Sequence, residues 1–294
     1  MNLQTEIRAV RERIGEPART DQMDNYITDE EILSWIYDAE QKIVRDVVED
    51  ALLEMLTLSQ ANTAAADGDY ALPSDFERII GVSLNSGQGH IDCRIIKPTQ
   101  KHLLETNPNW RPTGLTPVAW IFAGQVYVRP TPVAIVTNGI EIRYIKTPTR
   151  RYKHVESFTT AAGTASSIVD GALTQPNDYW NASTMRLKTG ALAGQERTIS
   201  DFVLSTTTLT VSTAFDAAPG TSIYYEMGTP TDLGDNFSPL IVAWASYLGL
   251  TKDRETDISQ TQKDEYERGV AQINARYAHI HQQETRRSTS NEPS

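Results

Sequence analysis

Residue types that can catalyse reactions or bind metals occur in this chain, but their spacing does not form a recognisable site. Only His279 and His281 lie close together, and they fall on different faces of a helix without a Cys or Asp in ligand register. The remaining histidines are scattered and are His90, His102 and His154. The sequence therefore predicts no metal site and no cofactor.

Carboxylates and the single cysteine give no catalytic pattern either. Glu30, Glu31, Asp38 and Glu40 belong to one predicted helix, and abundance on a helix surface does not supply the fixed separation that glycoside hydrolysis requires. Cys93 alone excludes an internal disulfide framework and a cysteine-rich metal site, and we interpret it as a small buried residue. We predict no catalytic residue and no enzymatic activity.

Three aromatic residues have two alternative uses. Tyr179, Trp180 and Tyr224 can stack on sugar rings, or they can pack in the core or at a contact of a small β-domain. We favour packing, because the surrounding segment must fold around its own apolar side chains. Binding of sugars or of a cell surface stays as the minor hypothesis.

Charge and hydropathy narrow the class of protein. The formal net charge of -11 argues against a general nucleic-acid coat, which needs clustered Lys and Arg. Residues 150–154 are the one compact basic run, interpreted as a solvated hinge rather than a nucleic-acid contact.

No apolar segment approaches the roughly twenty residues of a membrane span, and the charged residues 1–14 are unlike a secretory signal. We expect a soluble protein made in the cytoplasm.

A helix with a well-marked start organises the amino-terminal half. Thr28 can accept a backbone N–H and Glu31 can reach back to Thr28, which forms a capping box. We place this helix at 28–59, after a short amphipathic helix at 2–14. Its apolar stripe consists of Ile32, Ile36, Ala39, Ile43 and Val47.

That stripe needs a partner, which the carboxy-terminal part supplies. Helical patterns recur at 259–283 and at 238–250, where Ser238 is a good cap and Pro239 suits the first helical position. We therefore predict a helical frame closed by the two ends of the chain. The segment 286–294 has no apolar residue and is expected to be mobile.

Between these helices the pattern is typical of strands, so the predicted fold class is α+β. A mainly α-helical core with short strands at 70–147 occupies residues 1–154 and 229–294. It is interrupted at 155–228 by an inserted all-β domain, a sandwich or a barrel. The expected core of the insert is Leu173, Tyr179, Trp180, Leu187, Phe202, Leu209 and Phe215.

Several segments resemble head-to-tail adaptor (connector) proteins of tailed bacteriophages. The resemblance rests on the capped helix with Trp35, on the passages 70–79 and 142–146, and on the strand pair that ends at 128–132. It covers most of the chain outside the insert. The insert is similar to a β-module of several phage structural proteins.

The resemblance implies a structural virion protein rather than an enzyme. Such adaptors form a homo-oligomeric ring, typically of twelve copies, in the neck between capsid and tail. The ring docks on the portal protein, extends the DNA channel without sequence-specific binding, and offers a platform to tail nozzle, tail-tube and fibre proteins. It implies synthesis in the cytoplasm of a bacterial host and no membrane contact. We add the hypothesis that acidic side chains line the channel and repel DNA phosphates.

The same resemblance suggests where the contacts lie. The C-terminal segment of the family commonly reaches the portal, so the candidate portal-binding residues are Tyr266, Tyr277, Ile280, Arg286 and Arg287. Part of the capped helix face is a candidate subunit interface, formed by Trp35, Ile36, Ile43 and Val47.

Two other functions stay open. A tail-completion or fibre-attachment protein of the phage neck would be captured by purified tail rather than by purified portal. A virion-associated cell-wall hydrolase would clear bacterial cell walls in a turbidity assay.

Overall fold

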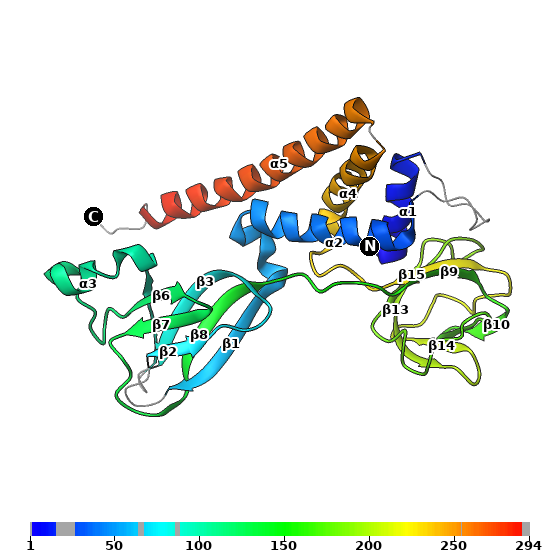
Figure 1. Ribbon diagram of the computed structural model, residues 1–294. Coiled ribbons are helices and arrows are strands. Elements are labelled where there is room, and N and C mark those ends of the chain that lie inside the picture. The colour runs from blue at the N-terminus through cyan, green and yellow to red at the C-terminus, as the bar shows by residue number, and fades with distance from the viewer. Residues whose placement is uncertain (1, 16–26, 64–67, 86–88, 254, 290–294) are drawn as a thin grey trace. The chain divides into compact units, whose positions relative to one another are not determined.

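The chain divides into two units, which Figure 1 draws as ribbons. The computed structural model describes residues 2–15, 27–63, 68–85, 89–253 and 255–289. The first unit combines Met1–Val47 with Pro148–Ser294, and the second is Val48–Thr147. The α+β class is confirmed, but the prediction of a mainly helical core holds only in part, because the second unit is built mainly of strands.

Four helices of the first unit come from the two ends of the chain. They are α1 (Leu3–Arg13), α2 (Asp29–Asp46), α4 (Ser238–Lys252) and α5 (Thr256–Thr289). Helix α4 contacts each of the other three, so the predicted packing of the capped helix on the carboxy-terminal helices is confirmed. Apolar burial drives this association, since side chains such as Ile36, Ile43 and Ile241 are removed from water.

The start of α2 forms as the sequence predicts. The Thr28 hydroxyl accepts from the Glu31 amide at 3.3 Å, and the Thr28 amide donates to Glu31 Oε2 at 3.1 Å. Lys252 Nζ lies 2.7 Å from Glu31 Oε1, so the same carboxylate also ties the first turn of α2 to the last turn of α4.

The predicted end of this helix at residue 59 is wrong. Helix α2 ends at Asp46, Val47 is extended with ψ 146°, and a 3-10 helix η1 (Glu49–Met55) leads into strand β1 (Leu56–Thr63). Strand β1 pairs with β8 over most of its length. This long-range pairing overrides the local helical propensity of the Ala, Leu, Glu and Met residues in this segment.

The start of α4 also differs from its prediction. Ser238 is the first residue of the helix and makes no capping hydrogen bond, while Pro239 lies in the first turn as expected. The Ser238 hydroxyl instead donates to Glu6 Oε1 of α1 at 3.1 Å. A buried carboxylate is the stronger acceptor, so the side chain is used for a tertiary contact.

The second unit contains two four-stranded sheets, ordered β1-β8-β3-β4 and β2-β7-β6-β5. The predicted hairpin is confirmed, since β6 and β7 are joined at Ala123 and Gly124, both with positive φ. Between β5 and β6 lie the short helices η2 (Pro98–Gln100), α3 (Leu103–Thr106) and η3 (Pro108–Trp110). The strands are β2 (Asp69–Ala71), β3 (Phe76–Asn85), β4 (His90–Asp92), β5 (Arg94–Ile95), β6 (Val118–Phe122), β7 (Gln125–Arg129) and β8 (Val136–Lys146).

Residues 154–228 form a seven-stranded antiparallel sheet in the first unit, ordered β10-β11-β14-β13-β12-β15-β9. Strands β9 and β10 at its two ends are consecutive, and between them Thr159 and Thr160 bond to Ile223 and Val169. The sheet is therefore barrel-like. Its strands are β9 (His154–Phe158), β10 (Ala161–Thr164), β11 (Ser167–Val169), β12 (Thr184–Leu187), β13 (Glu196–Val203), β14 (Thr208–Val211) and β15 (Tyr224–Gly228), and η4 (Asp235–Phe237) follows.

The core of this sheet contains the residues that the sequence predicts. Six of the seven expected side chains are buried in one apolar cluster, and Tyr179 packs against it half-buried. The cluster also takes in Met185, Tyr225 and Met227. That residues 155–228 fold by themselves, and that they belong to a known phage module, stay predictions.

Candidate functional site

A buried charge cluster joins α1, α2 and the segment that leads into β9. Arg151 Nη2 lies 2.6 Å from Glu6 Oε2 and 2.7 Å from Glu40 Oε1. The exposed fractions of Arg151, Glu6 and Glu40 are 5%, 0% and 1%. Hydroxyls complete the shell, because Ser238 donates to Glu6 and Thr231 donates to Glu40 at 2.9 Å. One guanidinium thus joins α1 to α2, and the Ser238 hydroxyl links α4 to the same cluster through Glu6.

The cluster holds more carboxylate than positive charge. Burial raises the pKa of Glu40 to about 7, against the opposing effect of Arg151, and burial also raises the pKa of Glu6. Burial alone would lower the pKa of Arg151, but the two carboxylates raise it overall. Both carboxylates of the cluster therefore hold a proton more readily than exposed carboxylates do.

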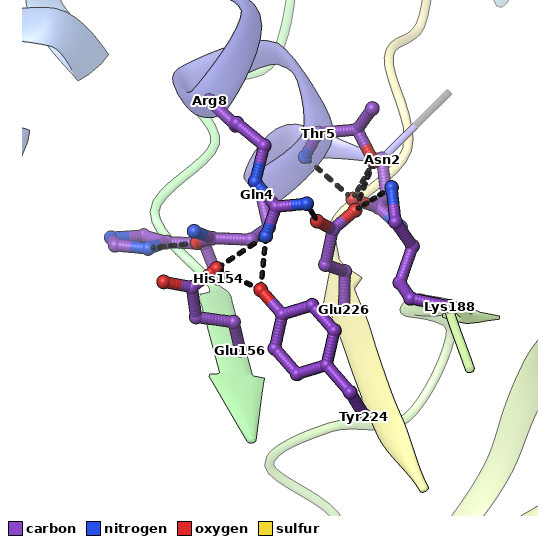
Figure 2. A network of polar contacts seen from close by, with 9 residues as sticks. All are labelled: Asn2, Gln4, Thr5, Arg8, His154, Glu156, Lys188, Tyr224 and Glu226. Carbon is purple, nitrogen blue, oxygen red and sulfur yellow. Dashed lines mark hydrogen bonds and ion pairs between the residues drawn. The ribbon is translucent and has the colours of Figure 1, made fainter. Parts of the chain in front are cut away.

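A second polar network joins α1 to the edge of the seven-stranded sheet, as Figure 2 shows. Arg8 of α1 forms an ion pair with the fully buried Glu226 of β15 and lies 2.6 Å from Glu156 of β9. Lys188 Nζ is 3.3 Å from Glu226, and the Thr5 hydroxyl donates to the same carboxylate at 3.0 Å. The buried charge of Glu226 is therefore balanced by Arg8 of α1 and by Lys188, the residue that follows β12.

The rim of the network is formed by an aromatic residue and a histidine. Tyr224 accepts from Arg8 and donates to Glu156 at 2.5 Å, and burial together with this bond raises the pKa of Tyr224. His154 Nδ1 lies 2.8 Å from Gln4 Oε1, and burial lowers the pKa of His154. These side chains bind one another, which is the arrangement of a structural joint.

Sequence reasoning missed both clusters. Arg151 was expected in a solvated hinge, and Glu40 on a helix surface, and both expectations are wrong because each residue is buried against the other. A signal was present in the sequence: Glu40 falls at helical spacing between Ile36 and Ile43, inside the apolar stripe. A carboxylate at such a position needs a buried cation.

The candidate portal-binding residues have different environments. Tyr266 is fully buried, its ring centroid lies 4.9 Å from that of Trp244, and its hydroxyl donates to Asp46 at 3.0 Å, so it stabilises the contact of α5 with α2 and α4. Tyr277 is half-buried on α5. The side chains of Ile280, Arg286 and Arg287 lie outside the described residues. A role in portal binding stays a prediction.

The candidate subunit interface lies largely inside the chain. Ile36, Ile43 and Val47 have exposed fractions of 1% or less. Trp35 is half-buried, and its ring faces Gly249 of α4. A role of these four residues between subunits stays a prediction. Of the four, only Trp35 is partly exposed.

The aromatic residues of the predicted insert pack within the chain. Trp180 is 1% exposed in the core, and the Tyr179 ring meets it edge-on with centroids 4.9 Å apart. The Tyr224 ring lies near Phe158 and under the Arg8 guanidinium. Their faces contact protein groups, as the packing interpretation expects.

The groups considered for catalysis are dispersed. In the described part of the chain, no three His, Cys, Asp or Glu side chains are grouped so that they could hold a metal ion. His90 lies 3.9 Å from Glu141, and His102 contacts the Thr99 carbonyl. Burial raises the pKa of Cys93 to about 12, which keeps its thiol protonated. Within the same described ranges, no helix is long and apolar enough to cross a membrane.

The two polar joints hold helices and a sheet of the first unit in place. Residues 1–151 match the SU10 adaptor protein family. The match covers half of the chain, and the protein therefore belongs to this family of bacteriophage adaptors. Membership indicates a structural component of the virion neck that associates with portal and tail components. No curated protein matches the chain.

Proposed function

We propose that this protein forms a homo-oligomeric ring that docks on the portal, extends the DNA channel and provides the platform for tail attachment. The observation that carries the proposal is the match of residues 1–151 to a phage adaptor family. A ring of identical subunits needs a protomer whose elements keep a fixed geometry. The buried Arg151 cluster supports that requirement, because it ties α1, α2 and α4 together.

The portal contact is assigned to the carboxy-terminal end of α5 and the residues that follow. Tyr277 offers a half-buried aromatic ring on this helix, and residues 286 and 287 contribute two adjacent arginines in the sequence. Tyr266 anchors the base of the helix to α2 and α4. The net charge of -11 fits a channel that DNA crosses without being held.

Capture by purified portal tests the proposal. Immobilised portal from the same phage should retain the full chain, and deletion of residues 286–294 should weaken retention while the circular dichroism spectrum loses only the signal of the last helical residues of α5. Unchanged retention of the deleted protein would remove the assigned contact.

The same experiment separates the neck adaptor from a tail-completion protein. Purified tails without portal serve as the second bait. Retention by tails alone, with none on portal, would overturn the proposed ring position.

A further inference from the structure

The second unit contains a cavity of about 440 Å³ with a cationic lining. Lys101, Arg111 and Arg129 line it, together with Trp120 and one carboxylate, Glu105. Lys101 and Arg111 are exposed and Arg129 is half-buried. Within the part of the chain that the structure describes, none of these three cations forms an ion pair with a carboxylate.

This basic surface contrasts with the rest of the protein. Five basic residues and one acidic residue lie between positions 94 and 129, whereas the chain as a whole has a net charge of -11. The three cations around the cavity are separated in the sequence, so they cannot be recognised there as a basic run. A group of Arg and Lys side chains that lines a cavity without ion pairs favours an anionic ligand.

Trp120 sets the position of two of the cations. Its ring is 3% exposed and stacks on Tyr127 with centroids 5.5 Å apart and planes 7° apart. The Arg129 guanidinium carbon and Lys101 Nζ each lie 5.7 Å from the centre of the Trp120 ring. The ring is therefore occupied by protein groups and leaves no open face on which a nucleic-acid base could stack.

A separate apolar groove of about 290 Å³ belongs to the same unit, and parts of its lining follow residues of the cavity lining in the sequence. Arg129 lines the cavity and the next residues, 130–134, line the groove. Pro112 lines the cavity, and Pro117 lines the groove. Val133 in its lining is 93% exposed, and Leu115 and Ile135, which neighbour lining residues in the sequence, are 83% and 78% exposed. Large apolar side chains exposed this fully indicate a contact surface.

We propose that the cavity and groove together bind an acidic segment of a partner protein, with carboxylates among Lys101, Arg111 and Arg129 and an apolar side chain against Val133. A nucleic acid fits less well, because its backbone has no apolar side chain for the groove and its bases find no open aromatic face here. The proposal concerns a surface of the second unit and does not depend on the ring arrangement.

The test is a titration of the full chain against a fluorescently labelled peptide with four glutamates around one leucine. The double variant K101Q/R111Q should weaken binding about tenfold or more, since both charge-assisted contacts are lost. The matched control is R94Q/K97Q, which removes two exposed cations from the same basic segment outside the cavity. This control should change the affinity by less than about twofold.

The apolar half of the surface is tested independently. Val133→Ser, at a fully exposed position, should weaken binding of the leucine peptide but not of a peptide with serine in place of leucine. Equal losses for K101Q/R111Q and R94Q/K97Q would reduce the effect to general electrostatics and overturn the proposal. It would also fall if the unaltered protein failed to bind the peptide, or bound a single-stranded oligonucleotide more tightly than the peptide.

Discussion

Among single residues, Arg151 has the greatest structural consequence. A buried ion pair is not in itself strongly stabilising, because desolvation opposes the attraction between the charges. Removing one partner is costly, however, since the remaining charges stay buried without compensation. Arg151 faces two carboxylates at hydrogen-bonding distance, so its loss would leave both Glu6 and Glu40 without their cation.

Arg151→Met should therefore lower the free energy of unfolding by about 3–5 kcal/mol. Urea denaturation followed by circular dichroism measures this change. Arg150→Met is the matched control, because Arg150 is exposed. Its guanidinium carbon lies 5.9 Å from the centre of the Tyr37 ring, which is a weak contact. The control should shift stability by no more than about 0.5 kcal/mol. Similar midpoints for both variants would contradict the assigned role.

The raised pKa of Glu40 determines how the free energy of unfolding should depend on pH. Its pKa is about 7 in the folded protein against 4.5 as the ordinary value, so the folded state binds the proton more tightly than the unfolded chain. The resulting stabilisation is fully present below pH 4.5 and is lost as pH rises through 7, a difference of about 3 kcal/mol. Glu6 acts in the same direction, because its pKa is also raised.

Glu40→Gln should flatten this decline, because an amide remains uncharged throughout. Melting temperatures of both proteins from pH 4.5 to 8 give the comparison. The lowered pKa of His154 makes both proteins lose stability as pH falls below its ordinary value of 6.5, so the difference between the two curves isolates Glu40. Parallel curves would show that Glu40 is already ionised in the folded protein.

Among the elements, the contact between α2 and α4 depends on a glycine. A Cβ atom at Gly249 would lie 2.9 Å from Trp35 Cζ3 and 3.2 Å from Ile14 Cγ2. Both neighbours are close, and an indole ring in a packed contact has little freedom to move. Close approach of the helices therefore requires the absence of a side chain at this position.

Gly249→Ala should destabilise the protein by roughly 1–3 kcal/mol, although alanine is the better helix former by about 1 kcal/mol. Thermal unfolding of this variant and of the double variant Trp35→Leu with Gly249→Ala measures the coupling. The double variant should be less stable than the unaltered protein. Gly249→Ala should, however, cost less stability when it is added to Trp35→Leu than when it is added to the unaltered protein. A higher melting temperature for Gly249→Ala alone would contradict the close contact.

Elements fixed by neighbouring residues could be predicted from the sequence, and those fixed by distant partners could not. The Thr28–Glu31 capping box and the turn at Ala123-Gly124 depend on local chemistry, and both are confirmed. The end of α2 was missed because β1 exists through its pairing with β8. Burial of Arg151 was missed because its two carboxylates lie more than a hundred residues away in the sequence.

At the scale of the whole molecule, the family match indicates a structural adaptor, and two polar joints hold the elements of its first unit together. Arg8 connects α1 to the seven-stranded sheet through Glu226, and Arg151 connects α1 to α2. Both joints involve α1, so the amino-terminal helix fixes the sheet and the other helices of the first unit to one another. Such fixed geometry suits the ring of identical subunits that we propose.

The most direct test of the proposed function is an electron cryomicroscopy reconstruction of the neck of the phage particle that encodes this chain. We predict several copies of the protein in a closed ring around the central axis, between portal and tail, with the carboxy-terminal end of α5 directed to the portal. A single copy away from the axis, or location of the protein elsewhere in the particle, would contradict the account.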